Sequence, residues 1–423
     1  EADLENIRQA WRWAIAKRRD DLIAPALESL HLFGLMRSYQ AMGKKLFISA
    51  RETFTQATHS ALWGKLMVRF PDVNDAMQAT YHTCLDIARK NHDPLEEAYC
   101  LRMLGVSLAH HDENTDEGIP TLEQSLALYQ QLGANFYVAQ VMDDLAYAYT
   151  ITADVQKHRQ YGEDCLALRR KIGDVVRSAD VIMNLATAHI FEGTLRDAIQ
   201  PYTEAEKIYK LTNNLAGLSH SYGLQAYAYY YTGEKELAYE KALKGYETAK
   251  DVQDIEGHIY GANILAIWHL VYGDLEIGKA YNTEVKAKIS RVHTPLIPIE
   301  FCDALIALRE KRYDVCYDFI QFRLNRVRET NRVNFGLVTV LLHAVIQTEK
   351  EVIQYADVER LSAMMKYVKA ESGEKTWIDN WQTYHSTLTI LKNKWGEAKF
   401  TEIWERGNPD TLLKQLLVWA DDI

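Results

Sequence analysis

The sequence is 423 residues long, 48% hydrophobic and 25% charged, with a formal net charge of −10. An acidic chain of this kind lacks the basic surface that general nucleic-acid binding requires, which argues against that class of function. No apolar run reaches the roughly 18 residues that cross a membrane as a helix. We therefore expect a protein that contacts neither a membrane nor nucleic acid directly.

The cysteines show no C-x-x-C spacing of the kind that metal or redox motifs use. They are Cys84, Cys100, Cys165, Cys302 and Cys316. An odd number without such a pattern argues against a disulfide framework. We expect reduced, mostly buried thiols and a cytoplasmic protein.

The first 57 residues have the periodicity of helices. Apolar side chains recur at helical spacing through the opening stretch, at Leu4, Ile7, Trp11, Ala14 and Ile15. Two further helical patterns follow in residues 22–39 and 41–57. We expect 1–57 to be a helical linker that caps the rest of the chain, with Trp11 anchoring it to the first hairpin.

A two-helix rhythm begins at about residue 58, and from residue 95 it repeats every 40 residues. The repeated segments are 95–134, 135–174, 175–214, 215–254 and 255–294. Shifting the sequence by one period superposes Ala186, Ala226 and Ala266, and glycine or polar turns punctuate the segments. A fixed period in the range of about 20–50 residues is typical of a solenoid, in which each repeat packs on its neighbours.

The rhythm loosens after residue 294. Terminal repeats of a solenoid face solvent on one side, so atypical sequence is expected there. The predicted organisation is therefore a linker over 1–57, regular repeats over 58–294, and divergent helical repeats with a C-terminal cap over 295–423.

The repeat resembles the tetratricopeptide repeat. In segment 175–214 the family's pattern of small and aromatic positions is matched by Leu185, Ala186, His189, Gly193, Ala198, Tyr202 and Ala205. The period of 40 residues departs from the usual value of about 34. The resemblance implies an all-α, right-handed superhelical solenoid of helix hairpins, preceded by the helical linker.

A second resemblance covers residues 3–39, which are similar to the helical linker of STAND-type signal-transduction NTPases, a class that includes many transcription regulators. The matching residues are Asn6, Ile7, Arg8, Ala10, Trp11, Trp13 and Ala14. This resemblance implies that the chain is the C-terminal sensor of a longer protein, and that a nucleotide-binding module precedes it.

Motifs for chemistry within the chain itself are weak. Three Gly-Lys pairs lack the upstream glycine and the Ser or Thr of a phosphate-binding loop. His110 and His111 are adjacent in a carboxylate-rich stretch, but neighbours on a helix point about 100° apart and cannot share a metal as an i, i+4 pair can. We expect no catalysis, no metal and no cofactor in this chain.

Ten side chains are predicted to line a concave groove, on the first helix of each hairpin. They are Gln140, Asp143, Tyr147, Asp180, His220, Tyr227, Tyr230, Tyr231, Tyr260 and Asn263. Tyrosine offers contact area and a hydroxyl at low entropic cost, which suits a peptide or protein partner. Leu224 and Tyr229 are expected in the core instead. The alternative is that the ten residues are ordinary solvated surface.

The leading functional hypothesis is a non-catalytic sensor that binds a protein or peptide inducer in its groove, as part of a STAND-type signalling protein. One alternative is a stand-alone scaffold or co-chaperone adaptor that holds peptide tails. Others are a peptide-pheromone receptor and a helical array that tethers substrate to a separate catalytic domain. The fold alone does not distinguish these hypotheses.

Overall fold

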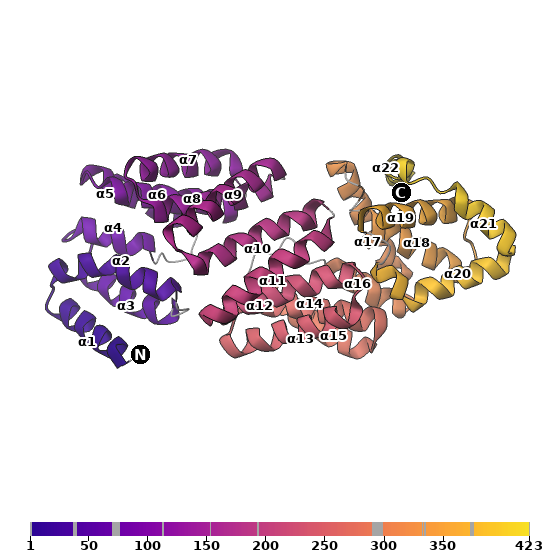
Figure 1. The fold of residues 1–423 in the computed structure, drawn as a ribbon, viewed down its shortest axis with the longest axis horizontal. Coiled ribbons are helices and arrows are strands. Elements are labelled where there is room, and N and C mark those ends of the chain that lie inside the picture. The colour runs from indigo at the N-terminus through magenta and orange to yellow at the C-terminus, as the bar shows by residue number, and fades with distance from the viewer. Residues whose placement is uncertain are drawn as a thin grey trace. The chain divides into compact units, whose positions relative to one another are not determined.

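The structure is a computed structural model that describes residues 2–36, 40–69, 77–111, 114–152, 154–192, 194–289, 299–331, 333, 336–372 and 376–422. Every regular element in these ranges is helical (Figure 1). The all-α part of the prediction is confirmed. Gly193, which contributes to the repeat motif, lies outside the described residues.

The N-terminal part is helical, and its first four helices share a hydrophobic core, whereas the fifth packs with the helix that follows it. The elements are α1 (Ala2–Ala16), α2 (Asp20–Met36), α3 (Gln40–Thr53), α4 (Ser60–Arg69) and α5 (Met77–Lys90). Trp11 on α1 is buried, donates a hydrogen bond from Nε1 to the Leu46 carbonyl at 3.1 Å, and packs on the Phe47 ring. Trp11 therefore fixes α1 to α3, within the predicted linker. Trp11 also belongs to one hydrophobic cluster with Leu62 and Leu66 of α4, and the expectation that it anchors the linker to the first hairpin stays a prediction.

Each of the five predicted 40-residue segments contains two long helices. They are α6 (Pro94–Val106, continued by a π-helical turn, Ser107–His111) with α7 (Thr115–Gln131), α8 (Asn135–Ile151) with α9 (Val155–Ile172), α10 (Val175–Glu192) with α11 (Leu195–Thr212), α12 (Leu215–Tyr231) with α13 (Lys235–Val252), and α14 (Ile255–Tyr272) with α15 (Leu275–Ile289). The superposed alanines Ala186, Ala226 and Ala266 are all buried. Their small size lets neighbouring helices approach closely.

Capping residues explain where these helices begin and end. Asp93, Asp154 and Asp254 precede α6, α9 and α14, and each accepts a hydrogen bond from a backbone N–H of the first turn. Gly173 ends α9 with φ of 76°, a left-handed conformation that favours glycine. The polar turn residues that mark the period in the sequence therefore stop one helix or start the next.

The C-terminal part continues as helices of more varied length and two 3₁₀ turns. These elements are α16 (Ile299–Arg309), α17 (Tyr313–Thr330), α18 (Leu337–Glu349), α19 (Tyr355–Ser372), η3 (Trp377–Asn380), α20 (Gln382–Trp395), α21 (Glu397–Arg406), η4 (Pro409–Thr411) and α22 (Leu412–Asp422).

The chain divides into two compact units. The first comprises residues 1–188 with 211–214, and the second comprises 189–210 with 215–423. Separate hydrophobic clusters form the interior of the first unit, and one continuous core runs through the second, from Ala226 to Ala420. The predicted division into 1–57, 58–294 and 295–423 stays a prediction.

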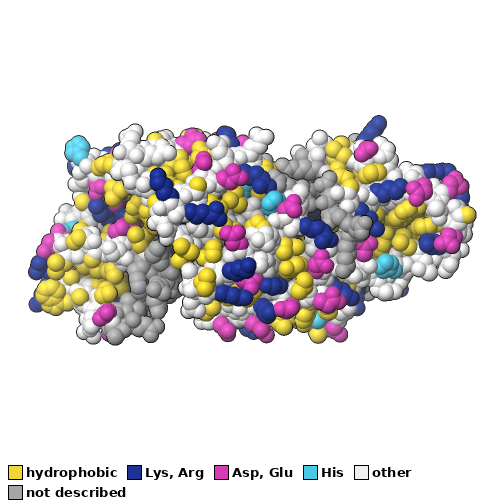
Figure 2. Space-filling view, viewed as in Figure 1, with side chains coloured by type: hydrophobic (Ala, Val, Ile, Leu, Met, Phe, Trp, Pro, Cys, Tyr) yellow, Lys and Arg dark blue, Asp and Glu magenta, His cyan; other side chains and the backbone are white. Residues whose placement is uncertain are grey.

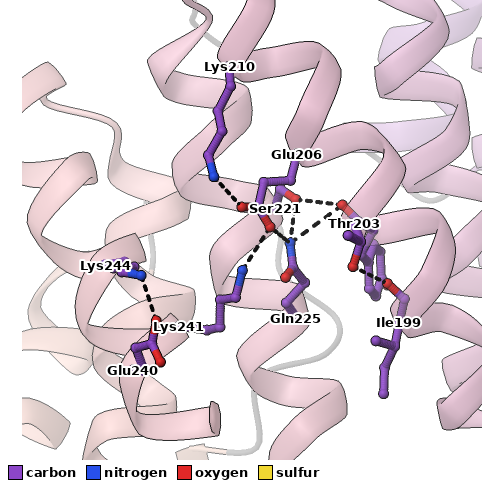
Figure 3. A network of polar contacts seen from close by, with 10 residues as sticks. Ile199, Thr203, Glu206, Lys210, Ser221, Gln225, Glu240, Lys241 and Lys244 are labelled. Atoms are coloured by element: carbon purple, nitrogen blue, oxygen red, sulfur yellow. Dashed lines mark hydrogen bonds and ion pairs between the residues drawn. The ribbon is translucent and has the colours of Figure 1, made fainter.

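A buried ionic network joins three helices of the second unit (Figure 3). Glu206 on α11 is 7% exposed and accepts hydrogen bonds from Lys210 at 2.6 Å, and from Lys241 and Gln225 at 2.8 Å. Burial disfavours its carboxylate, but these hydrogen bonds outweigh burial and lower the pKa of Glu206 to about 2. The two lysines offset the buried charge, so the network ties α11, α12 and α13 together and is structural.

The surface mixes charges of both signs. Acidic and basic side chains are interspersed over the face drawn in Figure 2. Of the helices in the described ranges, none combines the length and the apolar composition needed to cross a membrane.

Candidate functional site

Eight charged or amide side chains gather in the first compact unit, on the first helices of three successive hairpins and around α9. We call them the polar cluster: Arg102, Asp143, Asp144, Arg169, Asp174, Arg177, Asp180 and Asn184. Helices α6, α8 and α10 occupy equivalent places in the 40-residue repeat. The period that builds the array therefore also lines up these side chains.

The first contact of the polar cluster joins α6 to α8. Arg102 donates to both carboxylate oxygens of Asp144, from Nε at 2.5 Å and from NH2 at 3.2 Å. Both side chains are largely buried, with 16% and 15% of their surface exposed. A bidentate, charge-assisted pair of this kind fixes the orientation of both groups.

The second contact joins α8, α9 and α10. Arg169 is almost fully buried, donates to Asp174 at 2.7 Å, and lies 3.8 Å from a carboxylate oxygen of Asp143. Asn184 on α10 donates from Nδ2 to the other oxygen of Asp143 at 3.0 Å. Asp143 is thus held from two directions by neighbouring helices.

Asp143 carries a raised pKa in these surroundings. Burial is the main cause and brings its pKa to about 6, with the negative charges of Asp144 and Asp180 adding to the effect. Arg169 and the hydrogen bond from Asn184 act in the opposite direction. Perturbed carboxylates of this kind cluster at functional sites, although structural ion-pair networks produce them too.

Arg177 differs from the other two arginines of the polar cluster. Its guanidinium lies over the Phe136 ring, 4.8 Å from the ring centroid, at a distance typical of cation–π contact. The NH1 nitrogen is shielded from water and has no acceptor among the described residues. Burial and the positive charges of Arg169 and Arg102 lower the pKa of Arg177, while Asp174 and Asp180 oppose that change.

Phe136 also lines an open depression of about 540 Å³. It is lined by Phe136, Ile172, Gly173, Asp174, Val175 and Val176. The Phe136 ring therefore takes part both in the depression and in the cation–π contact with Arg177. The depression is mostly apolar, and Val175 is 58% exposed at its rim.

Helix α2 of the predicted linker contributes a second ionic group to the same unit. Glu28 pairs with the buried Arg69 of α4 at 2.6 Å and accepts a hydrogen bond from the Tyr137 hydroxyl of α8. His31, also on α2, is 3.0 Å from the hydroxyl of Tyr99 on α6. Burial lowers the pKa of His31 to about 4, and the charge of Arg69 adds to the effect. Helix α2 is thus held by three side chains of other helices, Arg69, Tyr99 and Tyr137.

The predicted groove residues of the first unit lie on the helices that carry the polar cluster. Gln140, Asp143 and Tyr147 are half-buried on α8, and Asp180 is half-buried on α10. Asp143 and Asp180 belong to the polar cluster itself. Whether these residues bind a partner stays a prediction.

Three predicted groove residues of the second unit are half-buried. Tyr227 and Tyr231 lie one turn apart on α12 with ring centroids 4.6 Å apart, as their spacing predicts. Arg323 of α17 lies close enough for its charge to act on both phenols, and burial raises the pKa of each. His220 stacks on Tyr260 at 5.1 Å.

The expectation that Tyr230 lines a groove was wrong. Tyr230 is fully buried, and its ring stacks on Trp377 of η3 at 5.6 Å. Tyr229, which was expected in the core, is only half-buried, whereas Leu224 is buried as expected. Neighbouring residues on a helix point about 100° apart, and Tyr229 and Tyr230 exchange their predicted environments while Leu224 keeps its own.

Tyr260 and Asn263 are also buried, which corrects their assignment to the groove. Tyr260 packs directly on Gly223 of α12, where an added Cβ would lie 2.6 Å from the Tyr260 Cβ. Asn263 donates to the sulfur of Cys302 on α16 at 3.6 Å. Both side chains therefore fill the space between packed helices.

Sequence reasoning predicted only Asp143 and Asp180 of the polar cluster and missed the other six residues, among them Arg102, Arg177 and Asn184. A signal for Asn184 was present, because it follows the predicted Asp180 by four residues and so shares its helical face. Arg177 precedes Asp180 by three residues, which also places it on that face. Arg102 had no such signal, because no groove residue was predicted on α6.

Metal binding finds no support in the described part of the chain, where no three His, Cys, Asp or Glu side chains are placed to hold an ion. The side chains of His110 and His111 lie outside the described residues. All five cysteines are free and buried, as expected. Burial raises the pKa of each thiol, which makes these cysteines poor nucleophiles.

Comparison with known proteins finds similar structures. Neither a family model nor a curated protein sequence matches the chain. The apo form of RapI aligns over 89% of this chain and 99% of its own, with 12% identity and a TM-score of 0.51. The apo form of the quorum sensor NprR from B. thuringiensis aligns over 88% and 99%, with 12% identity and a TM-score of 0.46. BtubC (BKLC) from P. vanneervenii aligns over 51% and 92%, with 16% identity and a TM-score of 0.44.

The likeness to RapI concerns the fold, because 12% identity carries no information about ligands. It extends over almost the whole of both chains. Together with the helix pairs of the structure, it confirms the predicted class, an all-α solenoid of tetratricopeptide-like hairpins.

Proposed function

We propose that this chain is a non-catalytic receptor module that binds an extended peptide, or an extended segment of a protein, along α6, α8 and α10. The observation that carries the proposal is the polar cluster. It places arginine, carboxylate and amide groups from successive hairpins on equivalent helices. An extended peptide presents alternating backbone donors and acceptors, which such a row of groups can match.

The geometry of the polar cluster favours binding over catalysis. Arg102 pairs with Asp144 across two helices, and Arg169 lies near Asp143 of a neighbouring helix. The groups are therefore preorganised and lose little freedom when a ligand binds. The flanking Gln140 and Tyr147 are half-buried on α8 and extend the polar row. The apolar depression beside Phe136 offers a place for one side chain of the ligand.

We further propose that the module is the sensor of a STAND-type signalling protein, and that an upstream nucleotide-binding module responds to the bound ligand. The resemblance of residues 3–39 to the linker of that class supports this. So does the attachment of α2 to the hairpins through Glu28 and His31, since a linker held in this way could transmit ligand binding. The coding sequence upstream of Glu1 tests the proposal. A phosphate-binding loop followed by a winged helix supports it, and a start codon at this point overturns it.

The cytoplasm is the proposed location. Five free, buried cysteines are compatible with a reducing compartment. Fractionation of cells that express the intact protein tests this, and recovery in an oxidising compartment would contradict it.

Selection of short random peptides displayed on phage, with the purified chain immobilised, tests peptide binding. Peptides selected in this way should bind in solution by calorimetry. Asn184→Ala, which removes the donor to Asp143, should weaken binding by about 10-fold, a typical loss for a hydrogen bond to a charged group. Gln130→Ala, exposed on α7, is the matched control and should leave affinity unchanged. Selected peptides whose affinity is insensitive to Asn184→Ala would place the binding surface elsewhere.

A further inference from the structure

We propose that Arg177 is the specificity-determining residue of this surface and that it recognises a carboxylate of the ligand, with an apolar side chain next to that carboxylate seated against Phe136. The inference rests on the proposed peptide-binding function and deepens it by naming the ligand's chemistry. The carboxylate could be the C-terminus of a peptide or the side chain of an Asp or Glu residue.

Arg177 has hydrogen-bonding capacity that the described residues leave unmet. A guanidinium carries five N–H donors and no acceptor. The NH1 group of Arg177 is shielded from water without an acceptor among the described residues, and the ring face of Phe136 is its close partner. A buried donor without an acceptor is costly, so a residue that keeps one is a candidate for ligand binding.

The charges around Arg177 also favour an anionic ligand. Within the polar cluster, Arg102 holds Asp144 through two hydrogen bonds, and Arg169 holds Asp174 at 2.7 Å. Arg177 lies in the field of both arginines, and their positive charges lower its pKa together with burial. Asp174 and Asp180 offset only part of this effect. A further anion at Arg177 would relieve the repulsion, whereas a cation would add to it.

The Phe136 ring that contacts Arg177 also lines an apolar depression. The depression of about 540 Å³ shares Phe136 with Arg177, and Ile172, Val175 and Val176 supply the rest of its apolar lining. A free inorganic anion would leave this apolar surface uncovered. A carboxylate attached to an apolar residue would cover it, which selects a peptide over a simple anion.

Three pools of short, N-acetylated random peptides distinguish the possible ligands. The first pool has a free C-terminus and no Asp or Glu. The second has an amidated C-terminus and contains Asp and Glu, and the third is amidated and contains neither. Each pool is equilibrated with the purified chain, and retained peptides are quantified by mass spectrometry after ultrafiltration. Retention of the first pool identifies a C-terminal carboxylate, and retention of the second identifies an acidic side chain.

We expect the first or second pool to be retained roughly 10-fold or more above the third, the usual effect of a charge-assisted hydrogen bond. Arg177→Gln should reduce retention to the level of the third pool. Lys171→Gln is the matched control, because it removes one positive charge from an exposed position nearby on α9 and should change nothing. Retained peptides should also be enriched in apolar residues next to the carboxylate, and Phe136→Ala should abolish that enrichment.

The melting temperature of Arg177→Gln, measured without peptide, separates lost recognition from lost structure. We expect it to be equal to or above that of the wild type, because the substitution removes a buried cation from the field of two arginines. Equal retention of all three pools would overturn the carboxylate proposal and leave peptide binding standing. Unchanged retention in Arg177→Gln would overturn it as well. If no pool is retained, the proposed function fails, and this inference fails with it.

Discussion

Trp377 stacks on Tyr230, with ring centroids 5.6 Å apart and planes inclined by 23°. This contact brings the 3₁₀ turn η3 against the end of α12. Two hydrogen bonds hold the turn there, from the Tyr272 hydroxyl to the Trp377 carbonyl at 2.9 Å and from the Asn380 amide to the Gly233 carbonyl at 3.0 Å. The C-terminal part of the chain therefore covers Tyr230 and Tyr272 of the repeats.

Burial of Tyr230 predicts a large loss of stability on truncation. Tyr230→Ala should lower the free energy of unfolding by about 3–5 kcal/mol, because it leaves a cavity against Trp377. Tyr229→Ala, one position along the same helix, should cost only about 1 kcal/mol, since Tyr229 is half-buried. Urea denaturation of the two variants checks the order. A larger loss for Tyr229→Ala would reverse the register of α12 found here.

The helix bounds of the repeats were predictable from the sequence because the turns carry their own signals. Gly173 adopts the left-handed conformation that stops α9, and Asp254 caps the first turn of α14. Turn and capping residues of this kind recur every 40 residues, so the helix bounds predicted for one repeat support those predicted for the next. The orientation of single side chains is less well determined, as the exchange of Tyr229 and Tyr230 shows.

The burial of Asn263 could not be predicted from the sequence for a different reason. It depends on Cys302 of α16, in a part of the chain where the period has faded. Contact between segments far apart in sequence leaves no trace in local spacing. In the first unit, by contrast, Asp143 and Asp180 were predicted together because one period relates their helices. Arg102 was missed because its role depends on pairing with Asp144 across two hairpins.

Substitution of Tyr227 and Tyr231 tests whether their side chains contribute to the packing of the second unit. Their rings contact each other, and the charge of Arg323 acts on both. Changing both to Ala should therefore cost about 2–4 kcal/mol, through lost packing. Changing both to Phe keeps the rings and should cost less, which thermal unfolding of the two double variants can establish. A stable double-Ala variant would indicate that these side chains are free to meet a partner.

Helix α1 contains one buried and one exposed tryptophan, so truncating each in turn tests how the predicted linker packs. Trp11 is 4% exposed and hydrogen-bonded to the Leu46 carbonyl, whereas Trp13 is 51% exposed. Trp11→Ala should cost about 3–5 kcal/mol in the stability of the core formed by α1, α2 and α3. Trp13→Ala should stay within about 0.5 kcal/mol, as surface substitutions usually do. Amide hydrogen exchange along α1 measures both effects. Fast exchange of α1 in the wild type would contradict the packing described.

The raised pKa of Asp143 predicts that the stability of the chain depends on pH. Its pKa in the folded chain is about 6, against an ordinary value of 3.8. Between these two values the folded state binds the proton and the unfolded state does not, so this group's contribution to stability falls as the pH rises from about 4 to 6. His31 acts in the opposite direction, because its pKa is lowered to about 4 and its contribution is lost as the pH falls. The pH dependence of stability in the wild type therefore combines the contributions of Asp143 and His31.

The difference between Asp143→Asn and the wild type isolates the aspartate, because His31 is present in both proteins. The amide cannot ionise and can still accept the hydrogen bond from Asn184. Relative to the wild type, the variant should gain up to about 2–3 kcal/mol between pH 4 and pH 7, the free energy equivalent of the raised pKa. Urea denaturation at a series of pH values measures that gain. Asp164→Asn, exposed on α9, serves as the control and should follow the wild type throughout. A gain that appears as the pH falls would mean that Arg169 and Asn184 stabilise the carboxylate of Asp143 more than burial opposes it.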